Sequence, residues 1–307
     1  EESVFDRFIK ACTEGDQLAA EELYDQTKMD VKEGEDAAEA LRKLVNDECS
    51  IGYTSFHLAC YHGHLEVVEW LLGLPGLDFG AKTHDEMYKL GATGLHLAVA
   101  AGSLEIVAYM VKNGFVPDVD VRDNRKCTPL IIAAQYGEVV ISHYLMRNGA
   151  DPRAVDQHGD TAMHWAAYKG HSDLVSLYAV GAMSGCDVPI NQPDNFGQSA
   201  LHLAALRGNA DTVQSLLDLG AERHNPDKKG KTALNLAVEK REPRDRGRTL
   251  GQMRIEHFLE DVHDHKSLMR WVQFSGKATY YAKMAMIIHT AYAYFFIVLA
   301  SRVVPAS

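Results

Sequence analysis

One segment recurs along most of this chain, and the repetition constrains the fold more than any other feature. Residues 161–170 (TAMHWAAYKG) are repeated as residues 199–208 (SALHLAALRG), and further copies begin at Thr54, Thr93 and Thr128. The glycines that end these copies stand at positions 63, 102, 137, 170 and 208, at spacings of 39, 35, 33 and 38 residues. Such a period predicts a repeat protein, in which each unit buries its apolar face only by stacking on its neighbours.

Each copy carries the signals of two short helices joined by a tight turn. The Thr or Ser at its first position can cap the first helix through the side-chain hydroxyl. The glycine after that helix permits a left-handed turn, and a Val-x-x-Leu-Leu pattern gives the second helix one apolar face. Between copies, Asp-x-x-Gly runs such as residues 156–159 are typical of a β-turn. The sequence therefore predicts an all-α stack of helix pairs with turn loops between them.

The repeated segment resembles the ankyrin repeat, which has a Thr-Pro-Leu-His-x-Ala signature and a period of about 33 residues. The resemblance extends over residues 4–240 and comprises five full copies, a weaker half copy before them and a partial copy that begins at Thr232. It implies an ankyrin-repeat solenoid, an array that binds other proteins. Extra residues relative to the period lie at 73–90 and 179–193, where we expect surface loops.

Four parts are expected along the chain. Residues 1–51 form an N-terminal cap, in which Ala37, Ala38, Leu41, Leu44 and Val45 indicate one amphipathic helix. Residues 52–240 form the ankyrin repeats. Residues 241–283 form a charged linker followed by capping and amphipathic helices, and residues 284–304 form a single transmembrane helix. The apolar positions that predict the capping helix are Leu250, Met253, Ile255, Phe258, Leu259 and Val262.

The C-terminal segment predicts a membrane span because residues 284–300 contain no charged side chain. With Arg302 reaching the interface, about 20 residues can cross a bilayer. The alternative is a buried helix packed against the array, but a stack of repeats has no deep core to receive it. Residues 264–307 carry five basic side chains against Asp264, a net charge of +4. Most of these precede the span, so the repeats are expected on the cytosolic side or on an equivalent matrix or stromal side.

The sequence predicts no catalytic or metal centre. His57, His96, His164 and His202 share one repeat position, where the ankyrin resemblance implies a structural role. The histidines after residue 256 lack the His-Glu-x-x-His order of a zinc site, and the chain contains no phosphate-binding, dinucleotide-binding or Gly-x-Ser-x-Gly motif. We therefore expect that this chain is not an enzyme and holds no metal.

Three further features limit the ligands that the chain can take. The five cysteines are scattered and form no Cys-x-x-Cys pair, so neither a disulfide framework nor a zinc site is indicated. The net charge of −11 argues against a nucleic-acid partner. No cofactor is expected, although His289 lies inside the predicted span and is a candidate ligand for a tetrapyrrole or a hydrogen-bond donor to a neighbouring helix.

Recognition of a protein partner is the function that remains. In ankyrin repeats, partners contact the tips of the β-turn fingers and the exposed ends of the first helices, and the candidate residues follow from that resemblance. On the fingers they are Asn124, Arg125, Lys126, Gln157, His158, Asp160, Asn195, Phe196, Gln198, Lys228 and Lys229. On the helices they are Tyr61, His62, Gln135, Tyr136, Tyr168, Lys169, Leu206 and Arg207.

Two classes of function are compatible with this layout. The first is a membrane-tethered interaction module that acts as an adaptor or as an accessory subunit of a larger membrane complex. The second is the substrate-recruiting N-terminal part of a polytopic protein, since the layout resembles that of ankyrin-containing protein S-acyltransferases and ankyrin-bearing cation channels. The Asp-His-His-Cys motif of those transferases is absent from this chain. Continuation of the natural chain past Ser307 into further spans would distinguish the two classes.

Overall fold

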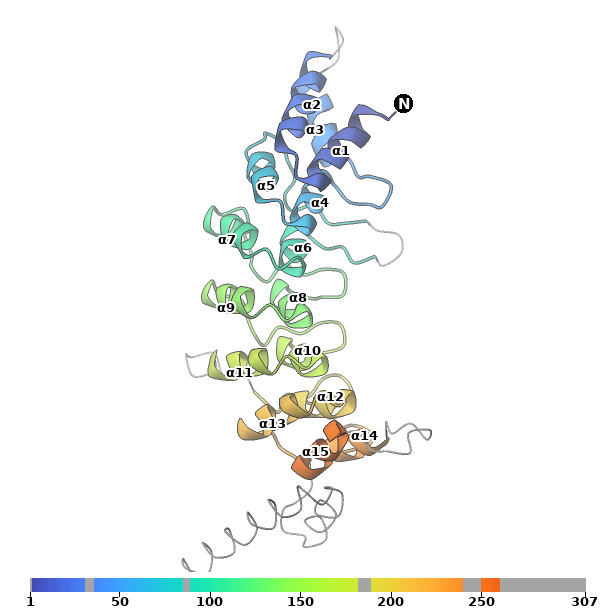
Figure 1. Ribbon diagram of the computed structural model, residues 1–307, viewed down its shortest axis with the longest axis vertical. Helices are drawn as coiled ribbons and strands as arrows, with labels where there is room; N and C mark the ends of the chain where they lie inside the picture. Colours follow the sequence, from blue (N-terminus) through green and yellow to red (C-terminus); the bar gives the residue numbers. More distant parts are fainter. Residues whose placement is uncertain (1, 31–35, 85–88, 182–188, 240–249, 260–307) are drawn as a thin grey trace, which may run out of the picture.

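The computed structural model describes residues 2–30, 36–84, 89–181, 189–239 and 250–259, which form fifteen helices and no strand (Figure 1). The expected all-α stack of helix pairs is therefore confirmed. The first helices of the pairs are α1 (Val4–Glu14), α4 (Ser55–His62), α6 (Gly94–Ala100), α8 (Pro129–Tyr136), α10 (Ala162–Lys169), α12 (Ala200–Arg207) and α14 (Ala233–Glu239). The second helices are α2 (Gln17–Met29), α5 (Leu65–Leu72), α7 (Leu104–Lys112), α9 (Val139–Arg147), α11 (Ser172–Gly181), α13 (Ala210–Asp218) and α15 (Leu250–Leu259). Helix α3 (Ala37–Asn46) stands between the first two pairs.

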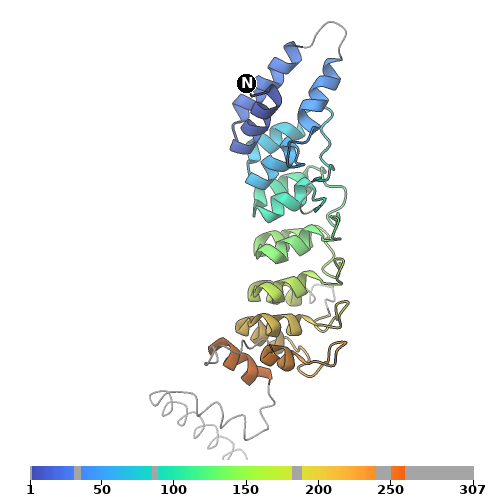
Figure 2. The same ribbon diagram turned by 90° about the vertical axis from the view of Figure 1, so that its right-hand side faces the viewer.

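The pairs stack into two columns of helices. Consecutive first helices contact one another from α1 to α14, and consecutive second helices do the same from α2 to α15. Figure 2 shows the resulting elongated array, with the loops that connect successive pairs gathered along one side. Each helix pair packs mainly on its neighbours, so the stability of the array depends on these interfaces.

Small side chains allow the first helices to approach closely. An alanine at the same position of five consecutive first helices is fully buried: Ala59, Ala98, Ala133, Ala166 and Ala204. The second helices contribute larger apolar side chains to the same core, among them Val67, Val107, Ile141, Leu174 and Val213. The apolar face predicted for the second helices is thus the one that packs in the array.

Glycine ends most first helices in the left-handed conformation, as predicted. The φ angle is 78° at Gly63 and 89° at Gly170. A Cβ atom at Gly170 would also approach Asn209 of the next repeat to 3.0 Å. Both the turn and the close packing of the next repeat therefore favour glycine here.

The two ends of the array continue the same columns. Helix α3 is the amphipathic helix expected before the first full repeat, and it buries Leu44 and Val45. Helix α15, expected as a cap, packs on both α13 and α14 and buries Ile255 and Leu259. It therefore stands as the second helix of the pair that α14 begins.

The predicted transmembrane helix 284–304, with His289, lies outside the described residues, as do residue 240 and the predicted linker and capping segment 241–283 apart from residues 250–259. Among the helices of the described ranges, none has the length and apolar character needed to cross a bilayer.

Candidate functional site

A buried histidine in four of the repeats joins the first helix to a loop, which in three of them carries candidate residues. His96 Nδ1 accepts a hydrogen bond from the Thr93 backbone N–H at 3.2 Å, and its Nε2 donates to the Cys127 carbonyl oxygen at 3.1 Å. Because a carbonyl oxygen can only accept, these bonds fix the neutral tautomer with the proton on Nε2. Burial lowers the pKa of His96 to about 4, so the ring stays neutral at pH 7.

The same arrangement recurs at His57, His164 and His202, whose Nε2 atoms lie 3.0, 3.2 and 3.2 Å from a loop carbonyl oxygen. Burial also lowers the pKa of each of these rings. The shared histidine position predicted to be structural is thus occupied by rings that tie helix to loop.

Each of the loops 123–127, 156–160, 194–198 and 227–231, here called fingers, is closed by its first aspartate. Asp156 Oδ1, for example, accepts the backbone N–H groups of His158 at 2.8 Å and Asp160 at 3.0 Å. Neighbouring fingers are joined by backbone hydrogen bonds, such as the bond from the Gln157 N–H to the Arg125 carbonyl oxygen at 2.9 Å. The fingers therefore form a continuous wall beside the first helices.

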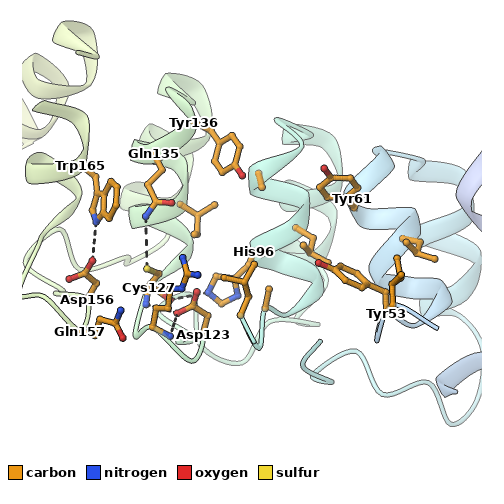
Figure 3. A pocket seen from close by; sticks show the side chains of 18 of the residues that line it. Tyr53, Tyr61, His96, Asp123, Cys127, Gln135, Tyr136, Asp156, Gln157 and Trp165 are labelled. Carbon is orange, nitrogen blue, oxygen red and sulfur yellow. Dashed lines mark hydrogen bonds between the residues drawn. The ribbon is translucent and has the colours of Figure 1, made fainter. Parts of the chain in front are cut away.

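A groove of about 630 Å³ lies between this wall and helices α4, α6, α8 and α10 (Figure 3). Tyr61 and Tyr136 line its helix side and remain 52% and 58% exposed. Large aromatic side chains that the stack leaves exposed are typical of protein-binding surfaces. His96 and Cys127 also line the groove, so the hydrogen bond that positions the finger lies at its edge.

The structure brings seven of the predicted partner-binding residues together in this groove. They are Tyr61, His62, Arg125, Gln135, Tyr136, Gln157 and His158.

Three other candidates connect their finger to the loop or finger before it. Asn124 Nδ2 donates to the Lys89 carbonyl oxygen at 2.9 Å, and Asn195 Nδ2 donates to the Gln157 carbonyl oxygen at 3.2 Å. The Lys228 ammonium group donates to the carbonyl oxygen of Asn195 at 2.8 Å. These side chains are committed to the finger wall.

Asp160 and Gln198 occupy the same position of adjacent fingers but differ in their surroundings. Gln198 Nε2 donates to Asp227 Oδ2 of the next finger at 3.5 Å. Asp160 faces Asp156 and Asp194, and burial together with these two carboxylates raises its pKa to about 7. Its buried Oδ1 has no hydrogen-bond partner among the described residues.

The remaining candidates lie towards the C-terminal half of the array. The Arg207 guanidinium lies 4.6 Å from the centroid of the Tyr168 ring. Phe196, 56% exposed at its fingertip, stacks against His158 with ring centroids 6.4 Å apart. Lys126 has a φ angle of 62°, whereas the three later fingers have glycine at this position. Lys169 and Lys229 are exposed and Leu206 is half-buried.

Trp165 lines the groove but is not among the residues predicted to bind a partner. It follows the repeated histidine, at a position that Leu58, Leu97 and Leu203 occupy in other repeats. Its indole N–H donates to Asp156 Oδ2 at 3.0 Å, and its ring lines the groove. A tryptophan at a position otherwise held by smaller apolar residues was the available signal.

Comparison with known families agrees with this architecture. Residues 56–156, 95–188 and 163–245 match the family model for ankyrin repeats in three copies, and residues 8–72 match the one for ankyrin repeats in many copies. The chain is an ankyrin-repeat protein. The match to residues 8–72 includes α1 and α2, in agreement with their place at the N-terminal end of the two columns.

Several proteins of differing names share these ankyrin repeats. The chain is 31% identical over 134 residues to the E3 ubiquitin-protein ligase KEG of Arabidopsis thaliana, which is 44% of this chain and 8% of the relative. Human neurogenic locus notch homolog protein 2 is 30% identical over 116 residues, 38% of this chain and 4% of the relative. Palmitoyltransferase AKR1 of Kluyveromyces lactis is 28% identical over 227 residues, 74% of this chain and 23% of the relative. The chain thus spans only a small part of these relatives, and what they share is a protein–protein interaction module.

Proposed function

We propose that this ankyrin-repeat protein docks a partner protein in the groove between the fingers and helices α4, α6, α8 and α10. The observation that carries the proposal is the exposure of Tyr61 and Tyr136 within a concave surface. Burying an exposed tyrosine against a partner removes a large apolar area from water at a small cost in side-chain entropy. Neither ring is needed to stack the repeats, so the array leaves both available for binding.

The proposed cellular role is that of a membrane-tethered adaptor or accessory subunit of a larger membrane complex. Its support is the uncharged segment 284–300 and the basic residues before it. The proposal places the array on the cytosolic or an equivalent side of the membrane and assigns no catalysis to this chain. Its partners would be proteins, including other subunits of that complex.

A second candidate function is recruitment of substrates for a protein S-acyltransferase. The specific observation in its favour is the match to Palmitoyltransferase AKR1, which extends over 74% of this chain, against 44% and 38% for the other two relatives. In that case the natural protein would be longer than this chain, with its catalytic motif beyond Ser307.

The proposal is tested by native mass spectrometry of the protein extracted from its own membrane in mild detergent. A mass near 34 kDa with stoichiometric neighbours is expected for an adaptor or accessory subunit, whereas a much larger single chain would favour the acyltransferase alternative. In the double variant Tyr61→Ala/Tyr136→Ala, the affinity for these stoichiometric neighbours should fall at least 10-fold, since truncating a hot-spot residue typically costs about 2 kcal/mol or more of binding free energy. Val140→Ala, at an exposed position outside the groove, is the matched control. Unchanged neighbours in the double variant would refute the groove as the docking site.

A further inference from the structure

The charged side chains of the groove differ in whether they already form hydrogen bonds within the array. Asp123 and Asp156 both line the groove. Asp123 Oδ1 accepts two backbone N–H groups of its own finger, at 2.8 and 2.7 Å. Asp156 Oδ1 does the same, and its Oδ2 accepts the indole N–H of Trp165. Both carboxylates are thus committed to the structure of the wall.

Arg125 lines the same groove, but its guanidinium group is available. Its backbone is fixed on two sides, because the N–H donates to Asp123 Oδ1 and the carbonyl oxygen accepts from the Gln157 N–H at 2.9 Å. Within the described ranges the guanidinium forms no hydrogen bond or ion pair, and the residue is exposed. A rigid backbone therefore presents a charged, planar donor group to the groove.

The facing wall of helices supplies no charge that would compete for Arg125. Tyr61, Gln135 and Tyr136 are uncharged there, and the aliphatic residues Leu58, Leu97 and Ile132 also line the groove. Arg125 is therefore the cationic side chain of the groove, opposite an uncharged helix wall, and the carboxylates of Asp123 and Asp156 beside it are already held by N–H groups of the array.

The groove is long enough to receive an extended occupant of several residues. It crosses four first helices, which at about 8–10 Å between neighbouring axes gives a length of roughly 25–30 Å. That length corresponds to about eight residues at ~3.3 Å per residue.

We propose that the groove binds an extended segment of a partner protein that places an Asp or Glu carboxylate on Arg125 and apolar side chains against Tyr61 and Tyr136. This inference rests on the proposed function and specifies the chemistry of the partner. A guanidinium group matches a carboxylate in a two-point hydrogen bond, and this geometry gives specificity as well as affinity. A single free guanidinium suits one carboxylate, whereas a polyanion would meet the overall charge of −11.

Selection from a random dodecapeptide library on the full chain in mild detergent tests the inference. The peptides recovered should carry an acidic residue at a fixed position among apolar residues. Arg125→Gln should weaken the best peptide about 10-fold to 100-fold, and replacing the peptide's acidic residue by its amide should have the same effect. Arg125→Glu should instead recover peptides with Lys or Arg at that position. Arg147→Gln, an exposed arginine of α9 outside the groove, is the matched control.

The variants separate this inference from the proposed function. Peptides without an acidic preference, or equal affinity for the wild type and Arg125→Gln, would overturn the carboxylate site. If affinity then still falls in Tyr61→Ala/Tyr136→Ala, the groove remains the docking site. If neither variant changes the affinity, or if no peptide is recovered, both the carboxylate site and the proposed docking in the groove are refuted.

Discussion

Acidification should destabilise the array through the histidines that hold the fingers, and His96 allows the effect to be calculated. Its pKa is about 4 in the folded protein against an ordinary value of 6.5, because burial disfavours the charged ring. Below pH 6.5 the unfolded chain therefore binds more protons than the folded chain, and stability falls as the pH falls. The loss begins near pH 6.5 and is complete near pH 4.

At pH 5 this difference in pKa corresponds to a loss of about 2 kcal/mol from His96 alone. His57, His164 and His202 add to the loss, since burial lowers the pKa of each. His96→Asn removes the titrating group and keeps the helix cap, because Asn235 accepts the Thr232 N–H at 2.9 Å at the same position of the last repeat. At pH 7 the variant should be less stable than the wild type by about 1–2 kcal/mol, since the Cys127 carbonyl oxygen loses its donor.

Urea unfolding followed by far-ultraviolet circular dichroism at pH 7 and pH 5 measures both effects. Between pH 7 and pH 5 the free energy of unfolding of the wild type should fall by about 2 kcal/mol more than that of His96→Asn. The slope of the free energy of unfolding against urea concentration should be the same for both proteins. His143→Asn, at an exposed position on α9, is the control and should behave as the wild type. Equal losses in the wild type and His96→Asn would refute the assignment of a neutral, buried His96.

Three further substitutions test the packing and the electrostatics of the array by urea unfolding. Asp160→Asn should raise stability at pH 8 by about 1 kcal/mol after allowance for solvent screening, and the gain should vanish towards pH 4. The raised pKa of Asp160 makes the folded wild type lose stability as the pH rises from 3.8 to about 7, so a gain independent of pH would contradict this cause. Tyr178→Phe should cost about 1–2 kcal/mol by leaving the buried Ser142 hydroxyl, 3.1 Å from the Tyr178 hydroxyl, without a partner, and adding Ser142→Ala should recover part of it. If the loss of stability in the double variant equals the sum of the losses in the two single variants, the two hydroxyls do not interact. Gly94→Ala should cost about 1–3 kcal/mol, because a Cβ atom there would meet the Phe56 ring, and unchanged stability would mean that the ring moves aside freely.

The sequence predicted the parts of the fold that are encoded within one repeat. Capping residues such as Thr161 and the glycines after the first helices act on their own turn, so their roles could be inferred locally. The pairing of α14 with α15 was not predicted, because ten residues of linker separate them and only the packing on α13 brings them together.

The candidate site was predicted in part for the same reason. Tyr61 and Tyr136 are exposed in the groove because their position at the end of the first helix is not used in stacking. Asn124 and Asn195 were expected at a partner surface, yet their amides donate to carbonyl oxygens of the loop or finger before their own. That bond depends on the distance between repeats, which no single repeat specifies.

The groove as docking face is tested most directly by photocrosslinking from within it. A benzophenone amino acid placed at position 136, in the groove, should form adducts with a partner protein in the native membrane. The same amino acid at position 140, which is 63% exposed and outside the groove, should not. Adducts that form at position 140 and not at position 136 would show that partners bind another face of the array.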